Sequence, residues 1–515
     1  MGELEQLLLL FVAAVILAAA ARRVGAPYPV FLALGGALLA FLPAAPSFTL
    51  PPELALALFV APVLLDAAYD ASLRDLKDNW VPVAGLVVVA VGLTTAAVAV
   101  VARLLIPELP WAAAIALGAV VAPPDAVAAT AVLRPLRPPH RITTILEGES
   151  LLNDATALLV YRLAIGAVAA NGFSVADVAP AFVVGVIGAL IVGPSLGWLT
   201  LKAMQRVQHV PTVIILQFVT TLGVWILAEH LRLSAVLTTV CFAITAAQTA
   251  PEQTPARIRI PAYAVWETVV FALNILAFIF IGLQMRPILA TLAAAERGRY
   301  FVVAGAVLVT VIVVRFAWHM SFNAVVRWRH RRFGFNPPRP MMRPTVGSGL
   351  IISWAGMRGI VSLAAVLALP SAFPYRDLIV LTAFTVVLGT LIIQGLTLKP
   401  LLRALDLHDD DPVGREVRAA RERALAAGLA SFASDQSAIA DAVRHELRAH
   451  LGSETTSAAG HERRADHNDF HRDALDAARQ AVLAMRASHE IGDDAFHQLE
   501  EQLDWLEMVG DRKTE

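Results

Sequence analysis

Long apolar runs recur along most of the chain, and they constrain its fold more than any other feature. Many reach the length that a helix needs to cross a hydrocarbon layer about 30 Å thick. With 57% hydrophobic residues and a mean hydropathy of +0.65, the sequence excludes an ordinary soluble domain. It predicts an all-α polytopic membrane protein with 13 transmembrane helices, centred on residues 5–21, 28–44, 53–70, 82–105, 112–131, 144–169, 178–200, 211–229, 234–249, 264–285, 300–325, 346–370 and 378–398.

Charge and cysteine content exclude several classes of function. The formal net charge is −1, so we expect no nucleic-acid partner. Cys241 is the only cysteine, which excludes an intramolecular disulfide and a cysteine-based metal site. No HExxH, GxSxG or CxxC pattern occurs at membrane depth, so neither an enzyme nor a cofactor is expected.

The distribution of Lys and Arg predicts the orientation in the membrane, because cytoplasmic loops are enriched in both. One set of alternate loops is rich in them, and the other holds only Arg103, Arg232, Arg286, Arg297, Arg299 and Arg376. The rich set includes Arg22, Arg23, Arg74, Lys77, Arg134, Arg137, Arg141, Lys202, Arg206, Arg257, Arg259, Arg327, Arg329, Arg331, Arg332, Arg339 and Arg343. We therefore expect the N-terminus outside and the C-terminus in the cytoplasm.

The composition changes near residue 405, which divides the chain into a transmembrane domain at 1–404 and a helical cytoplasmic tail at 405–515. Pro412 follows three aspartates and precedes a charged helix expected over residues 413–433. Residues 475–508 are predicted to form one or two amphipathic helices. His461, His467 and His471 either bind metal or sense pH, or are simply solvated.

The stretch from Ala122 to Leu159 carries the chemistry. Pro123 and Pro124 lack amide donors and disfavour helical geometry in the residues before them, so they break one spanning segment. Asp125 follows directly, and a carboxylate at membrane depth indicates a functional site. Broken helices of this kind point their half-helix ends at an ion near the bilayer midplane.

A second polar group follows on the next apolar segment. At about 100° per residue, Glu149, Ser150, Asn153 and Asp154 span an arc of roughly 140° on one helix. Oxygen atoms of this kind suit hard cations, and a poorly solvated carboxylate also binds a proton more readily than one in water. A site that holds either a cation or a proton is by itself an antiport mechanism. The alternative for Ser150 and Asn153 is that they only bond to backbone or to neighbouring helices.

These motifs resemble a known family. Pro-Pro-Asp at 123–125 and Gly-Glu-Ser-Leu-Leu-Asn-Asp-Ala at 148–155 are similar to the sodium/proton exchangers of the cation:proton antiporter superfamily, in its NhaP/NHE branch. The resemblance covers about residues 5–405 and extends more weakly to the tail. It implies an NhaA-like antiporter fold of two inverted repeats, with crossed and partly unwound helices 5 and 12. It also implies a homodimer, whose dimerisation part stands beside a mobile ion-binding core, in the cell (plasma) membrane.

The resemblance also assigns roles to residues. It implies cation and proton binding by Asp125, Asn153 and Asp154, with Ser150 as a further ligand, and so a Na+ site at Asp125, Ser150 and Asp154. Glu149 is expected to pair with Arg315, which lies mid-span, and pairing is also the physical expectation for two buried charges. That pair either supports the site or only braces the helices.

Three further positions follow from the same resemblance. Gly356 and Arg358, in Trp354-Ala355-Gly356-Met357-Arg358-Gly359, match the unwound twelfth helix, where Arg358 would neutralise helix carbonyls. Asp66 is a candidate funnel residue that guides cations, or it extends to the membrane interface. Asn274 matches an asparagine of the tenth segment, with helix packing as the alternative, and Asp70 and Glu147 are interpreted as interface residues.

The predicted function is exchange of Na+ for H+ by elevator-type alternating access, with Li+ and K+ as further candidate cations and the lipid bilayer as surroundings. Asn153 cannot exchange a proton, so only Asp154 of that pair titrates, which favours an electroneutral 1:1 exchange. The alternatives are a K+-selective cation/proton antiporter, a cation channel and, least favoured, a membrane-embedded enzyme. A channel would need a continuous pore with several weak sites.

Overall fold

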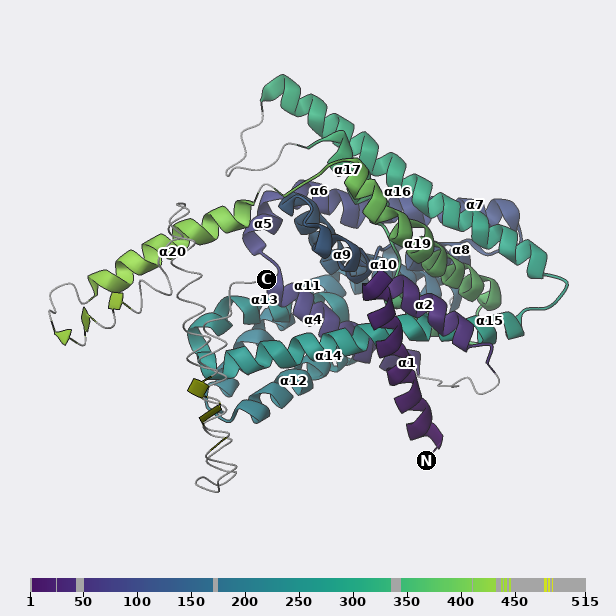
Figure 1. Cartoon of the computed structure of the whole chain (residues 1–515). Helices are drawn as coiled ribbons and strands as arrows, with labels where there is room; N and C mark the ends of the chain where they lie inside the picture. The colour runs from purple at the N-terminus through teal and green to yellow at the C-terminus, as the bar shows by residue number, and fades with distance from the viewer. Residues whose placement is uncertain are drawn as a thin grey trace. The chain divides into compact units, whose positions relative to one another are not determined.

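Figure 1 shows the computed structural model of the chain, which describes residues 2–24, 26–42, 51–169, 175–334, 344–409 and 411–431, and isolated positions after 436. Within these ranges every regular element is a helix. The chain divides into two compact units, Met1–Asp411 and Pro412–Glu515. Everything that follows on the site concerns the first unit.

In chain order, the helices of the first unit are α1 (Gly2–Val24), α2 (Tyr28–Leu39), α3 (Pro52–Ala55), η1 (Leu56–Val60), α4 (Ala61–Asp70), α5 (Leu73–Asp78), α6 (Trp80–Ala84), η2 (Gly85–Ala90), α7 (Val91–Leu105), α8 (Trp111–Val121), α9 (Ala126–Leu133), η3 (Arg134–Leu136), α10 (His140–Ala169), α11 (Val175–Met204), α12 (Val210–His230), α13 (Ala235–Gln253), α14 (Ala256–Leu283), α15 (Met285–Thr291), α16 (Arg297–Phe333), α17 (Val346–Trp354), α18 (Ile360–Leu367) and α19 (Arg376–Ala404). The elements η1 and η2 are π-helical turns, and η3 is a 3-10 turn.

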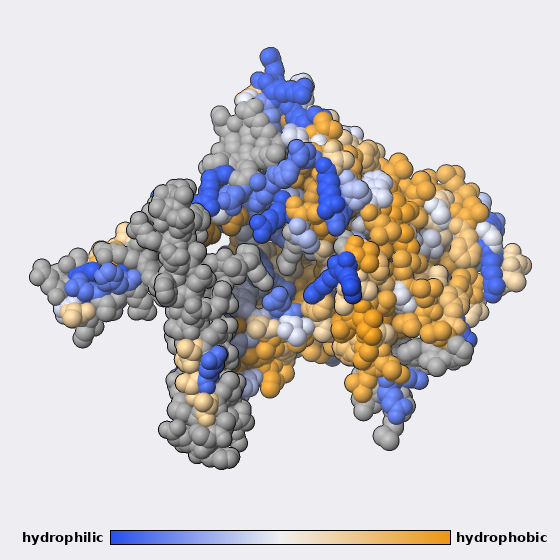
Figure 2. Space-filling view, in the orientation of Figure 1, coloured by the Kyte–Doolittle hydropathy of each residue, from blue (hydrophilic) through white to orange (hydrophobic). Residues whose placement is uncertain are grey.

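Among the described residues, seven helices are long and apolar enough to cross a membrane. They comprise Trp80–Leu105, His140–Val168, Val183–Met204, Val210–His230, Arg257–Thr291, Arg297–Phe333 and Arg376–Ala404. Their outer surfaces are apolar, and Figure 2 shows a largely orange face over α1, α2 and α19. Leu9, Ile16 and Val309 are more than half exposed, as expected for side chains that face lipid tails. The chain is therefore a multi-pass membrane protein.

Two apolar segments are broken near their middle, and a break in each of them is predicted from the sequence. α8 ends at Val121 and α9 begins at Ala126, so the break contains Pro123 and Pro124. α17 ends at Trp354 and α18 begins at Ile360, and the residues between them are not helical. α8, α9 and α17 each pack against both α10 and α19, and α18 packs against α19.

The second unit begins with α20 (Pro412–Ala430), where the sequence predicts a charged helix. His461, His467 and His471 lie outside the described residues, as does nearly all of the amphipathic stretch at 475–508.

Candidate ion-binding site

The two broken segments meet at their non-helical residues. The backbone N–H of Asp125 donates to the carbonyl of Met357 at 2.7 Å, which joins one break to the other. One carboxylate oxygen of Asp125 accepts the N–H of Val127 at 2.9 Å. Asp125 thus places a negative charge at the N-terminus of α9, where the helix dipole favours it.

Gly359 lies directly against the Asp125 carboxylate. A Cβ atom built on Gly359 would overlap the carboxylate oxygen Oδ2 of Asp125, so a larger residue fits only if one of the two broken segments moves. The backbone conformation does not require a glycine, because a φ of −133° is accessible to any residue. Gly359 is needed because the Asp125 carboxylate lies so close to it.

The C-terminal end of α8 is closed by polar side chains of the other broken segment. Arg358, of which only 1% is exposed, donates through Nε to the carbonyl of Val121 at 2.8 Å and through Nη1 to the carbonyl of Gly356. Ser362 donates to the carbonyl of Val120 at 2.7 Å. Free carbonyls at a helix end buried in a membrane are unfavourable, and a positive charge beside them is favourable.

α10 contributes the polar arc predicted from the sequence, but the structure divides that arc between two surroundings. Glu149 and Asn153 point into the helix packing, and they are 1% and 0% exposed. The Asn153 Nδ2 group donates to the carbonyl of Pro124 at 3.0 Å, which ties α10 to the break in the α8–α9 segment. Asn153 is therefore held by a backbone group of the crossing.

Glu149 and Arg315 form a two-pronged ion pair in the interior. Arg315 Nη1 and Nη2 donate to the two carboxylate oxygens of Glu149 at 2.5 and 2.8 Å. Arg315 also donates to the carbonyls of Ser353 and Ile352 at 3.2 and 3.1 Å. It closes the C-terminal end of α17 in the same way as Arg358 closes that of α8. Each broken helix thus ends on a buried arginine.

The other half of the arc faces a cavity of about 1350 Å³. Asp125, Ser150 and Asp154 all line it, whereas Glu149 and Asn153 are not among its lining residues. Asp154 is 7% exposed and lies close enough to Asp125 and Arg358 for their charges to interact. The cavity therefore presents two carboxylates and a hydroxyl beside the helix crossing.

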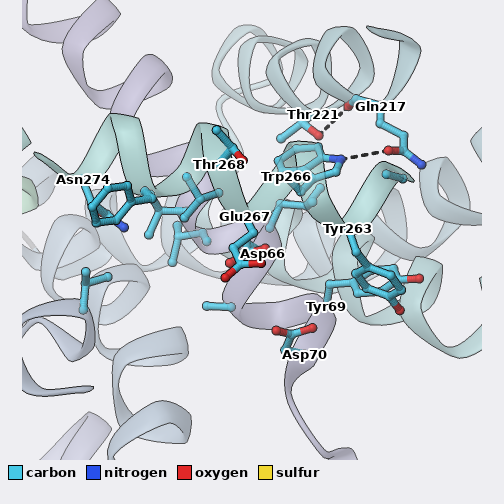
Figure 3. A pocket seen from close by; sticks show the side chains of 18 of the residues that line it. Asp66, Tyr69, Asp70, Gln217, Thr221, Tyr263, Trp266, Glu267, Thr268 and Asn274 are labelled. Atoms are coloured by element: carbon cyan, nitrogen blue, oxygen red, sulfur yellow. Dashed lines mark hydrogen bonds between the residues drawn. The ribbon is translucent and has the colours of Figure 1, made fainter. Parts of the chain in front are cut away.

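Further acidic and aromatic side chains form the wall between α4 and α14, shown in Figure 3. Asp66, Asp70, Glu147 and Glu267 line the cavity, and so does Asn274. Asp70 and Glu147, interpreted from the sequence as interface residues, are thus part of the cavity wall. For Asp70 the sequence held a signal, since a residue four positions after Asp66 lies on the same helix face.

Other residues that shape the crossing were not predicted from the sequence. Thr390 of α19 accepts the backbone N–H of Arg358 at 3.0 Å. Tyr161 of α10 donates its hydroxyl to the carbonyl of Ala365 in α18 at 2.6 Å. These residues, like Ser362, are ordinary helix residues in the sequence, and only the three-dimensional packing brings them to the broken segments.

Comparisons with known proteins show the family to which the chain belongs. A family model described as "Sodium/hydrogen exchanger, transmembrane" matches residues 8–404. An uncharacterized Na(+)/H(+) exchanger of Mycobacterium tuberculosis is 31% identical over 514 residues, which cover 94% of this chain and 92% of the relative. A sodium, potassium, lithium and rubidium/H(+) antiporter of Bacillus subtilis is 32% identical over 395 residues, which cover 73% of this chain and 58% of the relative.

The fold is also similar to a solved structure. The sodium proton antiporter MjNhaP1 of Methanocaldococcus jannaschii at pH 8 matches with a TM-score of 0.62 and 18% sequence identity. The match covers 79% of this chain and 99% of that one. The fold is thus that of the NhaP-type antiporters, and the family model and the relatives show the class of membrane transporter. The chain belongs to the sodium/hydrogen exchanger family, and it is a cation/proton antiporter.

Proposed function

We propose that the chain exchanges Na+ for H+ across the plasma membrane, with both ions using Asp154. The observation that carries this proposal is the joint presence of Asp125, Ser150 and Asp154 in one cavity beside two broken helices. Carboxylate and hydroxyl oxygens are the ligands that a small hard cation prefers. Asp154 is almost completely buried, so an ionised carboxylate there favours a counter-ion, and a proton and a cation compete for it.

The exchange is one for one because a single carboxylate of the Asn153–Asp154 pair can titrate. Asn153 stays neutral in both states, and its amide is bonded to the carbonyl of Pro124. If Asp154 carries either one Na+ or one H+, the loaded site has the same charge in both directions. Transport is then electroneutral.

The site moves as one body during an elevator-type cycle. Its helix ends are closed by Arg315 and Arg358, and its two breaks are joined by the hydrogen bond from Asp125 to Met357. These interactions favour displacement of the whole crossing over local unwinding. We propose further that the protein is a homodimer with its N-terminus outside, its C-terminus in the cytoplasm, and Asp66 in the cation funnel.

K+ is the second candidate cation. It is favoured by the relative from Bacillus subtilis, whose name includes potassium, lithium and rubidium beside sodium. Proteoliposomes that contain the purified protein and a pH-sensitive dye would be given Na+, Li+ and K+ in turn. We expect both Na+ and Li+ to drive proton movement. For each cation, we expect the rate to be the same with and without a membrane potential clamped by valinomycin. A rate that changes with the membrane potential would contradict one-for-one exchange. Proton movement with K+ but not with Na+ or Li+ would show that K+ is the substrate in place of Na+.

A further inference from the structure

The buried stripe of α16 changes character at Arg315. In the N-terminal half of α16 the buried residues from Val303 to Val311 are all apolar. The same buried face then continues with Arg315, His319 and Asn323, at intervals of four residues. Such spacing places all three side chains on one face of the helix, about 6 Å apart along its axis. The three side chains are 3%, 3% and 6% exposed. None of them lines the large cavity.

Two of these side chains keep polar atoms that the described residues do not satisfy. His319 Nδ1 and Asn323 Oδ1 are buried and have no hydrogen-bond partner within the described part of the chain. The same holds for Nε of Arg327, one turn further on. Burying a polar atom without a partner is unfavourable, and in native proteins such atoms are normally bonded to ordered water. Consecutive unsatisfied atoms on one face indicate a row of sites.

Small residues leave backbone close to this face. A Cβ atom on Gly349 of α17 would lie 2.7 Å from Asn323 Nδ2, and one on Gly356 would lie 2.5 Å from Arg315 Cδ. The two side chains thus pack directly onto the α17 segment at glycine positions. Asn323 thus contacts the same helix whose C-terminal carbonyls Arg315 binds.

The charge around the stripe decides what can occupy it. Arg315 and Arg141 both act electrostatically on His319. Glu149 balances the charge of Arg315, whereas Arg141 is bonded to the neutral side chain of Asn79, so a net positive charge remains beside the imidazole. The large cavity, in contrast, is lined by Asp125, Asp154 and further carboxylates. A cation is therefore repelled from the stripe, whereas a water molecule can donate to His319 Nδ1 or Asn323 Oδ1 and accept from Arg327 Nε.

We infer that the α16 stripe from Arg315 to Arg327 holds a row of buried water molecules, separate from the cation cavity, and that His319 and Asn323 hold Arg315 through it. Buried waters of this kind make about three hydrogen bonds each and are part of the structure. His319 and Asn323 are positioning residues. They act on the Glu149 ion pair and on the carbonyls of α17, and they do not touch the transported ion.

Radiolytic labelling of the wild-type protein tests the water without any mutation and without reference to transport. A short X-ray pulse generates hydroxyl radicals from bound water, and mass spectrometry locates the oxidised side chains. We expect His319 to be oxidised readily although it is buried. In H₂¹⁸O we expect the added oxygen on His319 to be ¹⁸O, because the radical would come from water beside the side chain. Phe384, 5% exposed and packed in the apolar core, is the dry control. Labelling of His319 no faster than that of Phe384 would overturn the inference.

The positioning role has its own variants, whose transport readout rests on the proposed function. His319→Leu fills the site with an apolar group, and His319→Gln keeps a polar one. We expect His319→Leu to lower the exchange rate about tenfold with little change in the apparent KM for Na+, and His319→Gln to restore most of the rate. Val307→Ala, in the apolar half of the same stripe, lowers stability without this effect. Equal exchange rates for the Leu and Gln variants would show that the water does not position Arg315.

Discussion

α10 presents two pairs of polar residues to two different surroundings. Ser150 and Asp154 face the cavity, where an ion can reach them. Glu149 directly precedes Ser150 and is bonded to Arg315, and Asn153 directly precedes Asp154 and is bonded to the carbonyl of Pro124. Glu149, Asn153 and Asp154 are buried and Ser150 is half-buried, but only Ser150 and Asp154 line the cavity.

A short polar motif on α10 thus serves two purposes at once. The cavity side supplies oxygen atoms whose charge must change during exchange. The packed side supplies fixed hydrogen bonds that keep the crossing in place while that charge changes. Substitutions on the cavity side should therefore alter ion binding, and substitutions on the packed side should alter stability.

The largest effect is expected from Asp154→Asn. The substitution keeps the shape of the side chain but removes the group that takes either H+ or Na+. We expect cation-driven proton movement in proteoliposomes to fall to the background of empty vesicles while the protein still elutes as a folded species. Asp377→Asn, at the start of α19, is a control carboxylate that should retain exchange. Wild-type exchange by Asp154→Asn would separate this residue from the transported ions.

The packed side is tested by a double-mutant cycle on Glu149 and Arg315. Removing either partner of a buried pair should reduce the free energy of unfolding by ~3–5 kcal/mol, because the other charge remains buried alone. Thermal unfolding of Glu149→Gln, Arg315→Gln and the double variant would measure it, and the double variant should lose less than the sum.

The exposed pair Arg162 and Glu229, with an N–O distance of 3.1 Å, provides the matched control for this cycle. A solvent-exposed pair contributes only about 0–1 kcal/mol. Additive losses at Glu149 and Arg315, like those expected of the exposed pair, would mean that the buried ion pair does not couple α10 to α16.

Gly359→Ala, a substitution next to α18 and not on α10, should also weaken ion binding. The new Cβ would displace the Asp125 carboxylate, and we expect the apparent KM for Na+ to rise about tenfold, which corresponds to ~1.4 kcal/mol. Gly166→Ala is the control, because a Cβ there meets no atom within 4 Å. Equal KM values for the two variants would show that Asp125 is not held by this close approach.

The smallest effect is expected from Ser150→Ala, which removes one neutral oxygen from the cavity side. The apparent KM for Na+ should rise several-fold, in line with about 1 kcal/mol for a single neutral hydrogen-bonding group. Ser195→Ala on α11 is the control, since Ser195 donates to the carbonyl of Ile191 in its own helix and does not line the cavity as far as the described residues define it. A Ser150→Ala variant with unchanged KM would leave the two carboxylates as the cation ligands.

Much of this arrangement could be predicted from the sequence. The apolar runs predict membrane helices, and Pro123 and Pro124 predict the break before Asp125, because both follow from local chemistry. The periodicity of α10 predicts the polar arc but not its division, since that depends on where α9, α16 and the cavity lie around the helix. Ser362, Thr390 and Tyr161 could not be found from the sequence, because their partners are backbone groups of the broken segments: the carbonyl of Val120, the N–H of Arg358 and the carbonyl of Ala365.

The most direct test of the shared site is the dependence of the apparent KM for Na+ on pH. If one proton and one cation compete for Asp154, the KM should rise by about tenfold for each unit of pH decrease on the acid side, with the maximal rate almost unchanged. Initial rates of exchange in proteoliposomes over a series of Na+ concentrations at each pH would give both quantities. A KM that is independent of pH while the maximal rate falls would show that the proton and the cation use different sites.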